Sequence, residues 1–387
     1  MKRLAKRMSR LGTETAFDCL CRAKALEHKM EVVHLEIGEP DFDTPKHICE
    51  SAKRAIDQGW THYGPSAGLP ELRGAIADYA GRVRGIRFSP EQVVVTPGGK
   101  PVMAFAIMAL VEEGDEVIYP NPGFPIYESM ISYMGGRPVP IQLREEKDFR
   151  LDAEEMASLM NPRTKLIIIN SPQNPTGGVL TREDLRMIAD IAQKSDAWVL
   201  ADEIYSEILY EGKFESISQF PEISRHLIIL DGFSKTFAMT GWRIGYGIMP
   251  AEMATLLAKI QTNTNSCTAS FTQRACLDAL KGPHDEVNQM VAEFRRRRDT
   301  IVDGLNEIPG FRCKKPAGAF YAFPNTEGTG TDCEVLADRL LEESGVACLA
   351  GTCFGKYGNG FIRFSYANSV ENIEKALEKV RKALANR

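Results

Sequence analysis

The sequence has no hydrophobic run long enough to cross a membrane. A spanning helix needs about 18 apolar residues or more, whereas the longest apolar stretch, residues 102–111, has ten and predicts a buried helix. Positive charge is also scarce, since 47 Lys and Arg stand against 52 Asp and Glu, a net charge of −5. We therefore expect neither a membrane nor a nucleic acid as partner, because binding to phosphate backbones depends on basic surfaces.

Patterns typical of metal sites and disulfides are missing as well. The nine cysteines form no CxxC pair, and the six histidines form no HxxxH or HExxH pattern. Cys19 and Cys21 stand too close together for the usual zinc spacing. We expect no bound metal, and reduced thiols in a cytoplasmic protein.

What the sequence does contain is an alternation of apolar strands and helices. Strand-like runs occur at 93–95, 116–119, 166–170, 198–201 and 227–230. Helical patterns separate them, among them 102–112 and 181–194, the latter opened by a capping box of Thr181 and Asp184. This alternation predicts an α/β fold, with a mostly parallel sheet covered by helices on both faces. Ligands of such sheets bind beyond the carboxyl ends of the strands.

The last hundred residues have a different pattern, typical of a smaller α+β domain. A long charged helix is predicted at 285–306, strands at 320–323 and 361–364, and helices at 334–344 and from 370 onward. The long helix carries four consecutive arginines at 295–298. Because Glu293 and Asp299 lie four residues from Arg297 and Arg295, we expect ion pairs on a solvent-facing helix surface rather than a nucleic-acid site.

Four polar segments follow the predicted strands, at the edge where the sheet should bind its ligand. They are TPGGK at 96–100, NSPQNPTG at 170–177, DEIY at 202–205, and the segment 234–246 with Ser234, Lys235 and Arg243. Each alone also fits a plain turn, a helix cap or a surface residue. Together they offer an amine, an acid, an amide, a phenol and an anion cradle. That set matches the aldehyde, ring nitrogen, phenolic oxygen and phosphate of pyridoxal phosphate.

These segments give the chain a resemblance to the class I and II aminotransferases of fold type I, which use pyridoxal 5'-phosphate. The resemblance covers nearly the whole chain. It rests on GEPDF at 38–42, YGPSAG at 63–68, GGK at 98–100, NPTG at 174–177, DEIY at 202–205, SKTFAMTGWRIGY at 234–246, GAFY at 318–321 and RFS at 363–365. It implies a large cofactor domain at 46–284 and a small domain built from both chain ends, 1–45 and 285–387.

The resemblance also implies a role for each motif residue. Lys235 should bind the cofactor aldehyde and move the substrate proton, and Asp202 should pair with the pyridine nitrogen. Tyr205 and Asn174 should hydrogen-bond the phenolic oxygen. The phosphate should be held by the backbone of Gly99 and Lys100 and by Ser234, Arg243 and, from the neighbouring subunit, Tyr63. Phe124 should stack on the ring, where relatives often have Trp or Tyr, and Arg363 should bind the substrate α-carboxylate with help from Asn174 and the Gly38 backbone.

The implied activity is transfer of the amino group of aspartate, alanine or an aromatic L-amino acid to a 2-oxo acid, expected to be 2-oxoglutarate, through pyridoxamine phosphate. The implied assembly is a homodimer with shared active sites. Two alternatives stay open: a lyase or aminocyclopropane-carboxylate-synthase-like enzyme of the same fold, and a cofactor-binding regulatory module, for which we expect no room before Gly38. The sequence does not single out the preferred donor. Lys100 and several arginines are candidates for binding a distal carboxylate.

Overall fold

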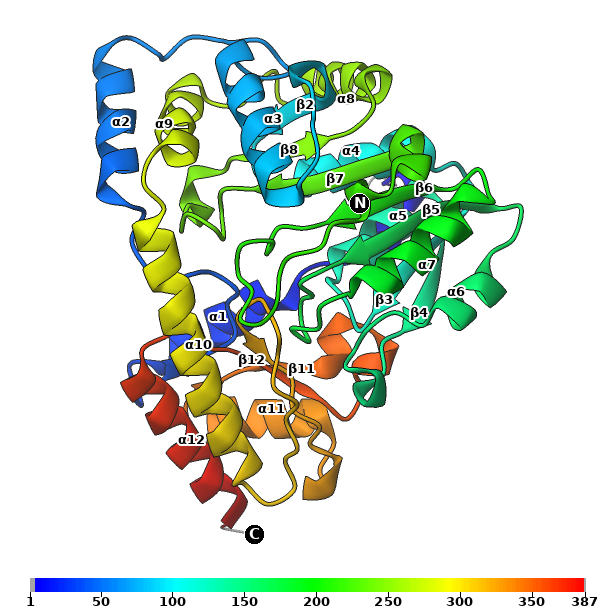
Figure 1. Cartoon of the computed structure of the whole chain (residues 1–387). Helices are drawn as coiled ribbons and strands as arrows, with labels where there is room; N and C mark the ends of the chain where they lie inside the picture. Colours follow the sequence, from blue (N-terminus) through cyan, green and yellow to red (C-terminus); the bar gives the residue numbers. More distant parts are fainter. Residues whose placement is uncertain (1–3, 386–387) are drawn as a thin grey trace.

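The computed structural model describes residues 4–385; residues 1–3 and 386–387, at the two ends of the predicted small domain, lie outside the described part. A seven-stranded sheet with the order β2-β8-β7-β6-β5-β3-β4 forms its centre (Figure 1). The strands are β2 (Val93–Thr96), β3 (Glu116–Asn121), β4 (Arg137–Gln142), β5 (Thr164–Asn170), β6 (Trp198–Asp202), β7 (Leu227–Gly232) and β8 (Gly245–Ile248). Only β8 runs antiparallel to its neighbours β2 and β7, so the predicted mostly parallel sheet is confirmed.

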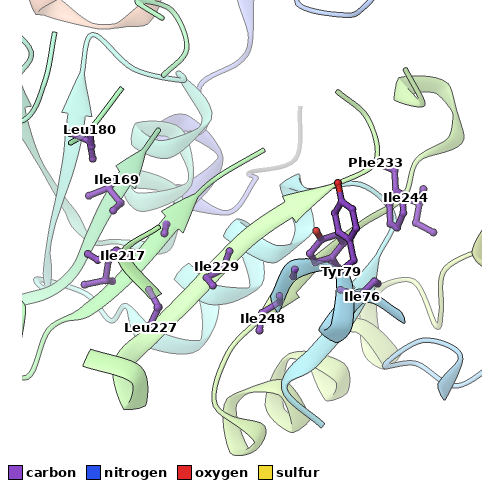
Figure 2. Packing of buried hydrophobic residues seen from close by; sticks show 14 of the residues in the cluster. Ile76, Tyr79, Ile169, Leu180, Ile217, Leu227, Ile229, Phe233, Ile244 and Ile248 are labelled. Atoms are coloured by element: carbon purple, nitrogen blue, oxygen red, sulfur yellow. The ribbon is translucent and has the colours of Figure 1, made fainter. Parts of the chain in front are cut away.

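Helices cover both faces of this sheet, and the alternation of side chains along β5 shows how. Ile167 and Ile169 pack in one apolar cluster with α2, α3, α7 and α9, part of which Figure 2 shows. Leu166 and Ile168 point to the opposite face and pack with α4, α5 and α8. The helices are α2 (Lys46–Asp57), α3 (Pro70–Arg84), α4 (Lys100–Leu110), α5 (Ile126–Met134), α6 (Ala153–Leu159), α7 (Arg182–Gln193), α8 (Ala251–Thr264) and α9 (Ser270–Lys281).

Elements from both ends of the chain lie together below the large sheet in Figure 1. Parallel pairing of Val33 with Val346 joins the two ends directly, and a third apolar cluster around Phe294, Phe320 and Phe364 forms their core. These elements are α1 (Thr15–Leu26), β1 (Val33–His34), α10 (Asp285–Asn306), β9 (Tyr321–Ala322), α11 (Cys333–Glu342), β10 (Val346–Ala347), β11 (Leu349–Ala350), β12 (Ile362–Ser365) and α12 (Val370–Ala385). Boundaries at 45/46 and 284/285 stay a prediction.

Short 3-10 helices complete the architecture, and most lie in the connections between these elements. They are η1 (Lys6–Arg10), η2 (Pro90–Gln92), η3 (Glu145–Lys147), η4 (Ile217–Gln219), η5 (Pro221–His226), η6 (Thr240–Trp242), η7 (Glu327–Thr329), η8 (Gly351–Phe354) and η9 (Lys356–Gly358). Within the described range, no helix is long and apolar enough to span a membrane. Residues 4–385 contain no cluster of His, Cys, Asp or Glu arranged to hold a metal, and all nine cysteines are free thiols.

The arginine run on α10 departs from the sequence-based prediction. Arg297 and Arg298 are buried rather than solvent-facing. Arg297 pairs with Glu293 at 3.0 Å, as expected, but also with Asp41 at 2.6 Å. Arg298 donates to the carbonyl of Pro316 at 3.1 Å. These arginines therefore tie α10 to loops on either side of it, and the tertiary partners could not be read from helical spacing.

Candidate active site

The carboxyl ends of β5, β6 and β7 border a pocket of about 450 Å³, which elements from both chain ends close from the other side. Of the predicted site residues, Tyr63 alone does not line it. The predicted residues that line the pocket are Gly38, Gly99, Lys100, Phe124, Asn174, Asp202, Tyr205, Ser234, Lys235, Arg243 and Arg363. A larger surface hollow of about 640 Å³ around Tyr79, Glu207 and His284 contains none of them.

Lys235 enters the pocket from the segment that follows β7. The apolar neighbours Phe233, Phe237 and Met239 are buried and anchor this segment. The Nζ of Lys235 donates a hydrogen bond to the carbonyl of Gly38. Burial lowers the pKa of Lys235 to about 8; Arg363 and Arg243 add to this effect, and Glu39 and Glu14 oppose it. Compared with an ordinary lysine at pKa 10.5, the neutral, nucleophilic amine is roughly 300-fold more abundant at neutral pH.

Asp202 lies at the end of β6, with its carboxylate on the floor of the pocket. Its Oδ2 accepts a hydrogen bond of 2.6 Å from the hydroxyl of Tyr127 on α5. Burial raises the pKa of Asp202 to about 6, and the Tyr127 hydrogen bond counteracts part of that increase by stabilising the charged form. A buried carboxylate with one hydroxyl donor is suited to a cationic N–H partner. Tyr127 was not predicted, because helical spacing gave it no distinguishing signal.

An amide and two phenols occupy the wall between Asp202 and Arg363. Asn170, at the end of β5, donates to the carbonyl of Asp202 at 2.9 Å and accepts from the backbone N–H of Asn174 at 3.0 Å. These bonds fix the loop that presents the Asn174 side chain. The hydroxyls of Tyr205 and Tyr321 are 2.7 Å apart. Tyr321 belongs to the GAFY motif at 318–321, and the resemblance assigns this tyrosine no role.

A glycine turn between β2 and α4 provides an anion cradle. Gly98 has a positive φ of +92°, and a Cβ built there would lie 2.4 Å from Nη2 of Arg243. Glycine is therefore required for the guanidinium to lie against the turn. Gly99 caps α4, and the first N–H groups of a helix lack partners within it and attract anions. The buried Ser234 also lines this pocket.

Arg363 of β12 is 3% exposed, and no ion pair to it is found within residues 4–385. Its Nη1 donates to Oδ1 of Asn174 at 2.9 Å, and its Nη2 donates to the carbonyl of Glu36. The guanidinium lies 4.6 Å from the ring centre of Tyr321 and 4.7 Å from that of Phe354, while its Nε has no partner in the described part of the chain. Because a buried cation without a counter-ion is costly, this arrangement is suited to a ligand carboxylate.

The outer part of the pocket combines aromatic rings with one ion pair. Phe124 packs edge-on against Tyr127, with ring centres 5.6 Å apart. Lys100 extends over Phe124, its Nζ 5.4 Å from the ring centre, and pairs with Glu14 at 2.6 Å. Glu14 was not predicted, since it precedes α1 and belongs to no motif. Tyr63 lies outside the pocket, 89% exposed on the surface of the chain.

Comparison with known proteins places this geometry in a family. The family model described as aminotransferase class I and II matches residues 30–380. The chain is 42% identical to an aspartate aminotransferase of Pyrococcus horikoshii, covering 92% of each chain. It is 38% identical to aromatic-amino-acid aminotransferase 2 of Thermococcus litoralis, covering 91% of this chain and 92% of the relative. The structure of a Thermus thermophilus aspartate aminotransferase with maleate superimposes with a TM-score of 0.95, at 37% identity over 99% and 100% of the two chains.

Proposed function

The chain belongs to the class I and II aminotransferases and is a pyridoxal-phosphate-dependent transaminase, and we propose that it accepts both aspartate and aromatic L-amino acids as donors, with 2-oxoglutarate as the acceptor. The buried guanidinium of Arg363, which forms no ion pair within residues 4–385, supports binding of an amino acid through its α-carboxylate. The choice of donors rests on Lys100 with Phe17 and Phe124 beside it. Relatives named for aspartate and for aromatic amino acids support the two donor classes. Alanine, the smallest of the donors that the resemblance implies, is included in the half-reaction screen described below.

The residues of the pocket fit pyridoxal phosphate. A Cβ at Gly98 would collide with the guanidinium of Arg243, so the glycine keeps this cation against the turn. Asp202 is a buried acid suited to a cationic N–H, and Lys235 is an amine with a lowered pKa. We propose that the backbone N–H groups of Gly99 and Lys100, with the side chains of Ser234 and Arg243, hold the phosphate. Asp202 and Tyr205 hold the ring, Phe124 stacks on it, and Asn174 assists Tyr205 at the phenolic oxygen. When bound, the cofactor supplies an aldehyde that takes up amines and a ring that withdraws electrons from the adjacent carbon.

Lys235 is proposed to move the proton in the reaction. A base works best when its pKa is near the working pH, and burial brings the pKa of Lys235 to about 8. Its Nζ can therefore take a proton from the substrate Cα and later release it. A positioned base of this kind contributes about 10²–10⁴-fold in rate. In the cofactor-free chain, Nζ donates a hydrogen bond to the carbonyl of Gly38.

Arg363 and Lys100 are proposed to bind the two ends of the substrate. Arg363 binds the α-carboxylate, since a guanidinium offers a planar fork of donors. Among the described residues, four cations line the pocket: Lys100, Lys235, Arg243 and Arg363. Once Lys235, Arg243 and Arg363 are assigned to the cofactor and the α-carboxylate, Lys100 is left for a distal carboxylate. Phe17 and Phe124 beside it offer apolar contact to an aromatic side chain.

A half-reaction screen tests the proposed donors. The holoenzyme is mixed with one amino acid at a time, without acceptor, and the cofactor absorbance is followed. Aspartate, phenylalanine and tyrosine should each change the spectrum and release one 2-oxo acid per active site, with continued turnover only after 2-oxoglutarate is added. Turnover without any acceptor would indicate a lyase instead, and a spectrum unchanged by all of these donors would refute the proposed specificity.

We also propose a homodimer with shared active sites and a cytoplasmic location. Tyr63 is the residue that supports the dimer, because its loop is firmly anchored although its side chain is exposed. The hydroxyl of Ser270 donates to the carbonyl of His62 at 2.7 Å, and the N–H of Leu69 donates to Gln273 at 2.8 Å. An exposed aromatic on an ordered loop suits a partner subunit. The nine free cysteines are in keeping with a reducing compartment.

A further inference from the structure

The outer half of the pocket contains a charge that the chain itself neutralises. Glu14, the residue before α1, and Lys100, the first residue of α4, form an ion pair of 2.6 Å across the pocket. Both residues line the cavity. The two side chains are partly exposed, 24% for Glu14 and 46% for Lys100. The pair therefore borders the cavity, and water can reach both partners.

The surroundings of the pair are mostly apolar. The Nζ of Lys100 lies 5.4 Å from the ring centre of Phe124 and 5.9 Å from that of Phe17. Leu20 and Ile37 also line the cavity. Two further acids line it, Glu39 and Asp202, and neither forms an ion pair with Lys100; Glu39 accepts a hydrogen bond of 2.7 Å from Thr240. With Glu14 in place, the region is apolar and carries no net charge from the pair; without it, an unpaired ammonium would face the substrate.

We propose that Glu14 is an exchangeable internal counter-ion that lets one pocket accept both uncharged and acidic side chains. An aromatic side chain binds against Phe17 and Phe124 while the Glu14–Lys100 pair stays closed. A distal carboxylate displaces Glu14 towards solvent and takes its place on Lys100. The exchange is feasible because a partly exposed ion pair is weak, and the released carboxylate of Glu14 is close enough to the surface to be hydrated.

This inference rests on the proposed role of Arg363 and predicts how a neutral substitution at residue 14 changes ligand preference. In Glu14→Gln, a dicarboxylate no longer has to displace a negative charge. Its dissociation constant should fall about fivefold, the ratio that corresponds to a surface pair of about 1 kcal/mol. The affinity for a ligand with an uncharged side chain should stay the same or decrease, because Lys100 is then unpaired. The preference for acidic ligands should therefore rise.

The test measures equilibrium binding to the holoenzyme by titration calorimetry, with maleate as the dicarboxylate and 3-phenylpropionate as the uncharged probe. Binding is preferred to rates because Glu14 also raises the pKa of Lys235. Asp18→Asn is the matched control: it removes the same charge one helical turn later on α1, from an exposed residue that does not line the pocket. A second background, Lys100→Met, removes the cation that the exchange requires.

In Glu14→Gln, the ratio of the maleate affinity to the 3-phenylpropionate affinity should rise about fivefold. The ratio should not change in Asp18→Asn, and Glu14→Gln should have no effect on it in the Lys100→Met background. The proposal is overturned if the ratio of the maleate and 3-phenylpropionate affinities changes less than twofold in Glu14→Gln. It is also overturned by an equal shift in Asp18→Asn, because that shift would come from the long-range electrostatic effect of removing a charge rather than from exchange at Lys100. If the wild type binds neither probe, the role of Arg363 is refuted, and so is the counter-ion role of Glu14 that rests on it. If the wild type binds both probes but the affinity ratio does not change in Glu14→Gln, the role of Arg363 is retained and that of Glu14 alone is refuted.

Discussion

At the scale of single residues, burial gives ordinary side chains unusual protonation states. The pKa values of Lys235 and Asp202 are both shifted towards neutral pH: burial lowers the pKa of Lys235 to about 8 and raises the pKa of Asp202 to about 6. The cause is the same for both, since a low-dielectric environment disfavours whichever form is charged. The sequence indicated these two residues through their motifs, but their protonation depends on neighbours brought together by the fold.

Lys235 should titrate far below the range of an ordinary lysine. In cofactor-free protein, labelling by a small acylating reagent followed by mass spectrometry should reach half its maximum near pH 8 for Lys235. The exposed Lys165 serves as the internal reference. Lys235→Ala should abolish transamination and covalent cofactor binding. A midpoint of about 10 or above would contradict the account of burial, and near-normal turnover in Lys235→Ala would contradict the assignment.

Tyr127 should hold down the pKa of Asp202. In Tyr127→Phe the carboxylate loses its hydroxyl donor, so its pKa should rise above the value of about 6. Less of it is then charged at pH 7, and the ring of the cofactor should be held more weakly. Carboxyl NMR titration of the cofactor-free protein measures the first effect and cofactor dissociation the second. Tyr133→Phe, on the same helix but outside the pocket, should change neither, and a titration midpoint equal in wild type and Tyr127→Phe would refute the role.

Arg363→Lys should raise KM and lower kcat together. A lysine keeps the charge but loses the planar fork, and its single ammonium cannot serve Asn174, the Glu36 carbonyl and a ligand carboxylate in the geometry that Arg363 uses. The substrate would then be bound less tightly and in a tilted orientation. Steady-state kinetics with the best natural donor is the measurement, and unchanged constants would show that the α-carboxylate binds elsewhere.

At the scale of elements, a buried ion network joins α3 to the strand ends that carry the site. Arg84, fully buried at the end of α3, pairs with Glu203 and with Asp231 at 2.7 Å each. Ser216 donates to the second oxygen of Glu203 at 2.7 Å. Glu203 follows Asp202 directly, and Asp231 lies at the end of β7, so the network fixes the strand ends behind the pocket. Burial raises the pKa of Glu203, and Arg84 opposes that shift.

Arg84→Met should destabilise the protein by about 3–5 kcal/mol, because it leaves two buried carboxylates uncompensated. The loss should be smaller at acid pH. Burial already raises the pKa of Glu203. Without the opposing charge of Arg84 it rises further above the unfolded value, so the folded state binds more protons and its stability decreases as pH increases through that interval. Urea unfolding at pH 5 and pH 7 measures both effects. The exposed Arg82→Met on the same helix is the control, and a loss equal to that of Arg82→Met would contradict the network's role.

Elements with clear periodicity were predicted well, and partners distant in sequence were not. The helix predicted at 285–306 matches α10, and the Thr181–Asp184 capping box is present, because local spacing and capping determine both. β4 was missed, since its two prolines and half-exposed face lack the apolar signal of a central strand. The network of Arg84 could not be inferred, as its partners lie 119 and 147 residues away.

At the scale of the whole molecule, the proposed dimer can be tested through Tyr63. Tyr63→Ala should be weakly active and Lys235→Ala inactive. In a mixed dimer, the Tyr63→Ala chain supplies an intact Lys235 and the Lys235→Ala chain lends it an intact Tyr63. One complete site per heterodimer results, so activity after subunit exchange should exceed the sum of the separate variants. Heterodimers that demonstrably form without such a gain would show that Tyr63 serves only its own chain.

The pocket itself was predictable as a set of motifs but not as a closed space. Segments that follow the strands of the large sheet carry most of the predicted residues, because parallel strands bring their carboxyl ends to one edge. Glu14 and Tyr127 belong to no motif, and only the folded chain brings them to the site. Tyr63 marks the opposite case: its motif was recognised, yet in the single chain it lies outside the pocket.

The pairing of β1 with β10 and the position of Arg363 in β12 also set the timing of maturation on the ribosome. Gly38 and Arg363 line the same pocket but are 325 residues apart in the chain (363 − 38). At about 5–20 residues per second, roughly 16–65 s pass between the synthesis of the first and the last. For the last 128 of these residues (363 − 235), the nascent chain carries Lys235 but not yet the guanidinium that we propose binds the substrate carboxylate. In the proposed mechanism, the group that recognises the substrate is thus synthesised after the group that moves the proton.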